Sequence, residues 1–130
     1  MIQTNAAAIE RRYRAYRSRM DAALALGVRD AAVAVHNEAF DRLSGGAAAP
    51  SFSYPVPVRH PSGGLRSRLG FRRVSGVAAI VFNTDPGAYA VHSGISPNWG
   101  GEPPRPFLDD AVIAADPSSR VRARLIKAFA

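Results

Sequence analysis

The sequence contains no cysteine at all. Disulfides, thiolate metal sites and cysteine nucleophiles are therefore excluded. It also lacks any apolar run near the roughly 18 residues that a membrane-spanning helix needs, so we expect no membrane partner. The first residues carry neither the basic nor the apolar segment of a signal peptide, and export is not indicated. The compartment stays open on this evidence, because a cysteine-free chain suits either redox environment.

Acidic residues are scarce, and the 130-residue chain carries a formal net charge of +7. No acid falls between Asp41 and Asp85, and beyond Arg42 this stretch contains five arginines in the middle of the chain: Arg59, Arg66, Arg68, Arg72 and Arg73. In a strand, Arg66, Arg68 and Arg72 would share one face and Arg73 would oppose them. Such a stripe could lie against a phosphate backbone. It could equally be a solvated strand face that discourages edge pairing.

Hydrophobic periodicity at the start of the chain predicts two helices within a helical region at 1–45. Asn5–Leu26 forms the first, because its apolar side chains recur at spacings of 4, 3, 4 and 3: Ile9, Tyr13, Tyr16, Met20 and Ala23. Arg29–Leu43 forms the second, with Ala32, Val35, Ala39 and Leu43 on one face. Gly27 interrupts the pattern, either as a kink or as a true turn.

Two segments rich in glycine and proline are expected to be irregular. In the first, at 46–64, the alternation of Phe52, Tyr54, Val56 and Val58 suggests an edge strand or an extended arm that adds to a neighbour's sheet. The second, at 94–106, is a loop that contains Trp99, the single tryptophan. A tryptophan on such a loop either supplies an interface or anchors the loop.

Between these segments, 65–93 is predicted to be β-structure. The pattern of a strand begins at Leu65. The β-branched run Val77–Phe82 is the clearest strand predicted in the chain. Asn83–Gly87 consists of turn-forming residues. Tyr89–His92 then follows as a short strand or a helical turn.

The C-terminal part, 107–130, is predicted to be helical. Phe107–Ala115 forms one helix, and Phe107 and Leu108 anchor it to the core. Asp116 and Pro117 then start another helix, as cap and first helical residue. Together these expectations describe one α+β domain over 1–130. It has N-terminal helices, a small antiparallel sheet with an extended arm and a long loop, and a C-terminal helix.

The residues that most often carry chemistry are present but isolated. His36, His60 and His92 do not pair with one another or with a carboxylate at the spacing of helical metal sites. Asp109 and Asp110 are neighbours at a predicted helix start, where acids complement the helix dipole. We therefore expect no catalytic residue, no metal site, no cofactor and no enzymatic activity.

The order of several short segments resembles one protein family. An alanine-rich helical region is followed by Gly64-Leu65-Arg66-Ser67, then by Tyr89-Ala90 running to Gly94. Arg105-Pro106-Phe107-Leu108 and a closing helix complete the chain. In this order and spacing the sequence resembles the neck and tail-completion proteins of long-tailed bacteriophages, a group that includes head–tail joining and minor tail proteins.

This resemblance implies a structural virion protein of the phage neck, made in the host cytoplasm. Such a protein forms a ring, with a hexamer favoured over a dodecamer, that joins the DNA-filled head to the tail and completes the tail end. Its neighbours would be the portal-bound connector or stopper, the tail terminator and tail tube proteins, and the genomic DNA in the channel. Residues expected at subunit interfaces are Tyr54, Trp99, Arg105 and Phe107, and those expected to face DNA are Arg66, Arg68, Arg72 and Arg73.

The positive charge supports an alternative function. A basic module that contacts duplex DNA without sequence specificity would need only the arginine-rich middle of the chain.

Overall fold

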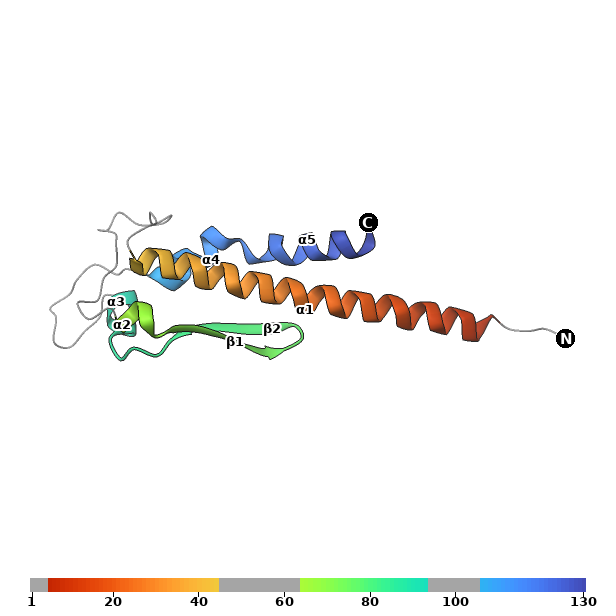
Figure 1. The fold of residues 1–130 in the computed structure, drawn as a ribbon, viewed down its shortest axis with the longest axis horizontal. Coiled ribbons are helices and arrows are strands. Elements are labelled where there is room, and N and C mark those ends of the chain that lie inside the picture. Colours follow the sequence, from red (N-terminus) through yellow and green to blue (C-terminus); the bar gives the residue numbers. More distant parts are fainter. Residues whose placement is uncertain (1–4, 45–63, 94–105) are drawn as a thin grey trace.

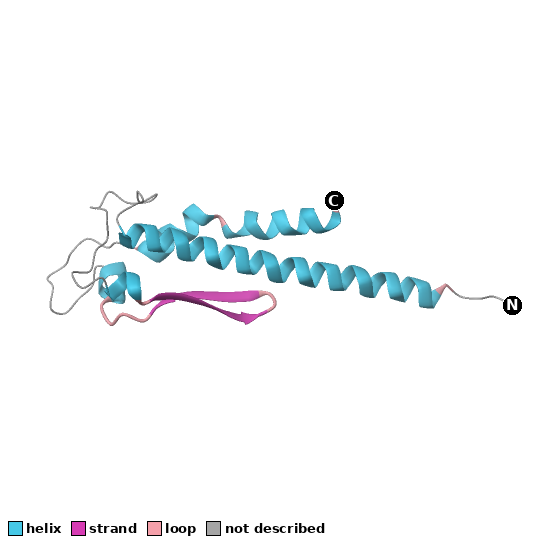
Figure 2. Ribbon diagram, viewed as in Figure 1, coloured by secondary structure: helices cyan, strands magenta, loops and turns pink. Residues whose placement is uncertain are grey.

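The computed structural model describes residues 5–44, 64–93 and 106–130. One long helix, α1 (Ala6–Ser44), forms the axis of the molecule. A hairpin of β1 (Leu69–Ser75) and β2 (Ala78–Asn83) lies along one side of it, and α4 (Phe107–Ala115) and α5 (Pro117–Phe129) lie along the other (Figure 1). Two short helices, α2 (Gly64–Ser67) and α3 (Ala88–Ser93), sit at the base of the hairpin (Figure 2). The fold is α+β, as predicted.

Helix α1 runs without interruption for 39 residues, so the prediction of two separate helices is wrong. Gly27 lies inside it and is buried. A Cβ atom at this position would lie 2.8 Å from the Cα of Val121 on α5. The glycine therefore marks the point where two helices approach too closely for any side chain, and it is neither a kink nor a turn.

The hairpin is antiparallel and pairs Leu69 with Asn83 and Arg73 with Ala79, with an irregularity between Arg73 and Ser75. The strand predicted at Val77–Phe82 is confirmed, shifted by one residue to Ala78–Asn83. The strand predicted to begin at Leu65 is wrong there, because Gly64–Ser67 forms a helical turn. The Asn83 side-chain amide donates to the carbonyl of Leu65 at 2.6 Å, which fixes this turn at the base of the hairpin.

A side-chain turn links β2 to α3. The backbone N–H of Asp85 donates to Oδ1 of Asn83 at 2.9 Å, and the N–H of Gly87 donates to Oδ1 of Asp85 at 2.7 Å. These are the local bonds that favour Asn and Asp in turns. Of the two structures left open for Tyr89–His92, the helical one is confirmed by α3.

The junction of α4 and α5 follows the prediction of a cap at Asp116 and a proline at the first helical position. Asp116 adopts a left-handed conformation, with φ of 48°, and its N–H donates to the carbonyl of Val112 at 3.2 Å. It therefore ends α4 and starts α5 at once. Its side chain makes no capping bond to the backbone and accepts instead from the Ser118 hydroxyl at 3.2 Å.

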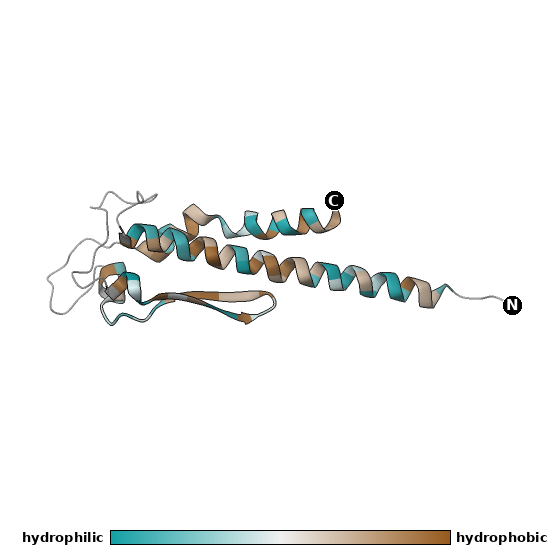
Figure 3. Ribbon diagram, in the orientation of Figure 1, coloured by the Kyte–Doolittle hydropathy of each residue, from teal (hydrophilic) through white to brown (hydrophobic). Residues whose placement is uncertain are grey.

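The hydrophobic core is confined to the C-terminal half of α1 and the elements packed on it. Its buried residues come from the four helices α1 to α4: Val35, Ala39, Leu43, Leu65, Val91, Phe107, Ala111 and Ala115. The face predicted from Ala32 to Leu43 is thus confirmed as buried. The apolar stripe predicted on the N-terminal half has a different outcome, since every residue from 9 to 22 is exposed (Figure 3).

No helix within the described ranges is both long and apolar enough to cross a membrane.

Candidate functional site

The three arginines expected to share one strand face, Arg66, Arg68 and Arg72, do not lie on one strand. Arg66 lies on α2, with its guanidinium 5.9 Å from the ring centre of Phe40. Arg68 lies in the turn before β1, and only Arg72 and Arg73 lie on the strand. The expected parity fails because α2 breaks the strand before Leu69.

Arg72 and Arg73 occupy successive strand positions and so point to opposite faces of the hairpin. Arg73 faces α1, where its Nη2 donates to the carbonyl of Ala25 at 2.7 Å. Phe71 lies on that same face and packs edge-on against His36, with ring centres 5.4 Å apart. Arg73 therefore helps to hold the hairpin on the helix, while Arg72 faces the opposite way.

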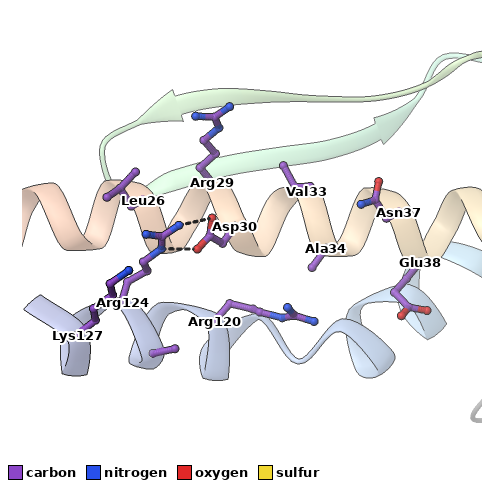
Figure 4. Close-up of a pocket in the computed structure, with 11 residues that line it drawn as sticks. Leu26, Arg29, Asp30, Val33, Ala34, Asn37, Glu38, Arg120, Arg124 and Lys127 are labelled. Atoms are coloured by element: carbon purple, nitrogen blue, oxygen red, sulfur yellow. Dashed lines mark hydrogen bonds and ion pairs between the residues drawn. The ribbon is translucent and has the colours of Figure 1, made fainter.

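A different basic surface is assembled where α5 crosses α1. A groove of about 880 Å³ lies between the two helices (Figure 4). Four cationic side chains line it, Arg29 from α1 and Arg120, Arg124 and Lys127 from α5. We call this set the basic groove. The sequence contains each of these residues, but Arg29 and Arg120 are 91 positions apart, and only the packing of α5 on α1 brings them together.

Two carboxylates also line the basic groove, and each is already paired. Asp30 accepts from Nε of Arg124 at 2.6 Å and from Nη2 at 3.3 Å, a two-point contact that Figure 4 shows between α1 and α5. Glu38 accepts from Nη1 of Arg42 at 2.8 Å, one helical turn further along α1. Within the described part of the chain Arg29, Arg120 and Lys127 have no carboxylate partner, so the groove keeps an excess of positive charge.

The charge of the groove acts on Asp30 directly. The hydrogen bond from Arg124 lowers the pKa of the Asp30 carboxyl below its usual value of 3.8, and the charges of Arg124, Arg29 and Arg120 lower it further. The same bond raises the pKa of Arg124. Asp30 therefore stays ionised at neutral pH, and its link to Arg124 sets the spacing of the two helices along the groove.

The basic groove continues toward the hairpin. Leu26 and Arg29 also line a second groove of about 380 Å³, whose other wall includes Phe71 and Arg73. Arg73 is thus the one residue of the predicted stripe that lies beside the basic groove. An anionic surface laid along α1 would meet Arg73, Arg29 and the α5 cations in succession.

The residues expected at subunit interfaces fall into two groups. Tyr54, Trp99 and Arg105 lie outside the described residues, as do the predicted arm and loop and His60. Phe107 is fully buried, at 0% exposure, and packs in the core. This corrects its assignment to a subunit interface and confirms its role as an anchor, since Phe107 offers no surface to a neighbour.

Sequence spacing missed one contact between a histidine and an acid. Nε2 of His92 on α3 lies 3.6 Å from Oδ1 of Asp109 on α4, and the imidazole packs edge-on against Phe107. That distance is beyond a hydrogen bond. The nearby Ser93 hydroxyl donates to the carbonyl of Tyr89, so it is not poised toward His92 as a nucleophile would be. The pair reads as a packing contact between α3 and α4.

Across the part of the chain that is described, no cluster of three or more His, Cys, Asp or Glu side chains could hold a metal ion. Comparison of the chain with protein families, with curated proteins and with solved structures finds no match.

Proposed function

We propose that this chain is a structural protein of a bacteriophage neck. In this role it forms part of a ring that joins the DNA-filled head to the tail and completes the tail end. The proposal starts from the resemblance in the order of sequence segments. It does not depend on a catalytic site.

The observation that carries the proposal is the large apolar surface left open by so small a chain. Ile9 and Tyr13 on α1 are each 64% exposed, and they line one depression together with Tyr16 and Met20, which are 60% and 43% exposed. Soluble monomers rarely leave contiguous apolar patches of this kind uncovered, and such patches mark sites of protein contact. A part that is completed only by its neighbours in an assembly has this character.

The basic groove is compatible with the same role. A subunit that borders a channel through which DNA passes gains from unpaired cations that attract phosphate without reading sequence. In this proposal Arg29, Arg120 and Lys127 are the candidates for that contact.

The location of the protein provides the test. Antibodies raised against the purified chain should label the junction between head and tail in electron micrographs of purified virions of the phage that carries this gene. Label on the capsid surface or the tail tip, or no protein in virions by mass spectrometry, would contradict the proposal. Empty heads and free tails serve as internal controls for the specificity of the label.

The basic groove also favours a second candidate, a free-standing module that binds duplex DNA without sequence specificity. This candidate predicts salt-dependent binding by the isolated protein. Substituting Arg29→Gln and Lys127→Gln leaves the Asp30–Arg124 pair intact and should reduce the slope of log K against log salt by roughly 1 to 2, because each lost phosphate contact contributes about 0.9.

The matched control for this test is Arg68→Gln with Arg72→Gln, which removes the same charge from the hairpin. An equal effect of both double variants would assign binding to overall charge rather than to the groove. Absence of binding at low salt would exclude the free-standing module and leave the neck proposal standing.

A further inference from the structure

The N-terminal half of α1 is an amphipathic helix without a partner along most of its length. Figure 1 shows it projecting past both the hairpin turn and the end of α5. Its apolar stripe stays open, with Tyr16 60% exposed and Met20 43% exposed. Tyr16 also stacks on Phe129 at the end of α5, with ring centres 4.8 Å apart, so the stripe is continuous with the α1–α5 contact. We call Ile9, Tyr13, Tyr16 and Met20 the open stripe.

Positive charge borders the open stripe. Arg12 and Arg17 line the same shallow depression as its four apolar residues. Five arginines fall between residues 11 and 19 of the sequence, whereas Glu10 is the one acid between residues 5 and 20 and pairs with Arg14 at 2.7 Å. Two open stripes facing each other would therefore bring arginines together. A partner for this helix must offer apolar side chains flanked by acids.

The chain itself carries such a surface beside the middle of α1. An apolar groove of about 550 Å³ is lined by valines from four parts of the fold: Val28 and Val35 on α1, Val77 and Val81 on the hairpin, Val112 on α4 and Val121 on α5. Asp109 precedes Val112 by three positions on α4 and so lies on the same side of that helix. Asp116 follows the end of α4 and is next in sequence to Pro117 and Ser118, which line the groove. Both acids are exposed, as is Ile113 beside them.

One molecule cannot bring these two surfaces together. Val28 is the groove residue nearest to the open stripe along α1, and it lies 15 residues from Tyr13 on the same unbroken helix. At a rise of 1.5 Å per residue this is about 22 Å, and the straight helix holds the two surfaces apart. Any contact between them must join different copies.

We propose that the open stripe of one copy docks in the apolar groove of a second copy of this chain. Tyr13 and Tyr16 enter the groove as aromatic anchors, in the helix-in-groove mode of recognition. Arg12 and Arg17 meet Asp109 and Asp116 of the receiving copy. Because stripe and groove are different surfaces, the contact is heterologous, and its repetition closes a ring or extends a filament. The inference deepens the ring of the proposed function by naming its subunit contact.

Because the sequence contains no cysteine, a cross-linking reagent specific for thiols can react only at cysteines that are introduced. Purified Tyr13→Cys protein is mixed with purified Ile113→Cys protein that carries a larger tag, so that every dimer is identified by its size on a gel. Treatment with a short bismaleimide should give the mixed product as the main one. A dominant product between two Tyr13→Cys chains would mean that stripes pair with stripes and would overturn the proposal, as would the absence of any product at the highest soluble concentration.

A series of charge-reversal variants tests the proposed contacts between arginine and aspartate, and so adds a measurement that does not rest on the two cysteine positions alone. In the Tyr13→Cys chain, adding Arg12→Glu and Arg17→Glu should lower the yield of mixed product about tenfold or more, because acids then face acids. Adding Asp109→Arg to the receiving chain should restore part of that yield. The matched control, Arg68→Glu with Arg72→Glu, makes the same change of charge on the hairpin and should leave the yield unchanged.

Cross-linking that requires added duplex DNA would assign the stripe to nucleic acid and overturn the proposal. The proposal would also be overturned if the control and the test variants lost equal amounts of mixed product, since overall charge would then explain both losses. The assay uses purified protein alone, so the contact can fail while the neck role stands, and the neck role can fail while this contact is found.

Discussion

At the scale of single residues, Gly27 shows how much of the packing rests on one position without a side chain. A methyl group there would lie 2.8 Å from the backbone of Val121, which no rotamer change can relieve. Gly27→Ala should lower the free energy of unfolding by about 1–3 kcal/mol through overpacking, less the roughly 1 kcal/mol that alanine gains over glycine in a helix. Urea denaturation measures the change.

Gly76 offers the control for that substitution. A Cβ atom at Gly76 meets nothing within 4 Å, so Gly76→Ala should change stability little. A Gly27→Ala protein as stable as the parent would show that α5 does not approach α1 as closely as described. The sequence marked Gly27 as special but could not give the reason, because the clash involves a residue 94 positions away.

The Asp30–Arg124 pair carries a prediction about pH. The folded pKa of Asp30 lies below its usual 3.8, so the pair contributes stability above that pH and loses it as pH falls through the folded value. Asp30→Asn should therefore lower Tm modestly at pH 7, and the variant and the parent should converge in acid below pH 3.8. Both side chains are more than a third exposed, so salt should reduce the effect. A difference in Tm that persists unchanged at pH 3 would contradict this account.

At the scale of elements, α1 has two halves with different support. The C-terminal half packs against four other helices and the hairpin, whereas residues 9–22 are exposed throughout. Isolated helices of such length are marginal in water, because tertiary packing supplies most helical stability. Amide hydrogen exchange in the isolated protein should therefore be much faster over 9–22 than over 31–43. Uniform protection along α1 would mean that the N-terminal half already has a partner in solution.

The same contrast marks the limit of what periodicity could reveal. The spacing of Ile9, Tyr13 and Tyr16 predicted the helix and its apolar face, and that much is confirmed. It could not tell whether the chain itself covers the face, because amphipathicity indicates that something binds there without saying what. In short elements, by contrast, the type of secondary structure itself was predicted wrongly. Leu65 and Arg66 read as strand, but burial of Leu65 at 1% exposure in the core and its contact with Asn83 favour a helical turn.

At the scale of the whole molecule, the α+β class and the single hairpin followed from local patterns, whereas the surfaces of interest did not. The basic groove needs Arg29 beside Lys127, and the apolar groove needs Val77 beside Val112 and Val121. These are contacts between distant parts of the chain, which no local pattern encodes. The prediction of an arginine stripe was wrong because it assumed one continuous strand, whereas the segment changes from helix α2 to strand β1.

The molecule that results is polarised in a way that suits an assembly part. Its basic groove, its apolar groove and its open stripe lie on different sides or ends of one long helix. In the proposals made above, the basic groove binds phosphate, and the apolar groove and the open stripe bind each other in neighbouring copies. The proposed neck role links these surfaces in one object, a ring with protein contacts around it and DNA within it.

The most direct test of this account is electron microscopy of lysates from the phage that carries this gene, with the gene interrupted. The account predicts DNA-filled heads and separate tails, and joining restored when the intact gene is supplied in trans. Tails of abnormal length would add a role in ending tail growth. Intact, infectious particles from the interrupted phage would contradict the account and bring the DNA-binding candidate to the front.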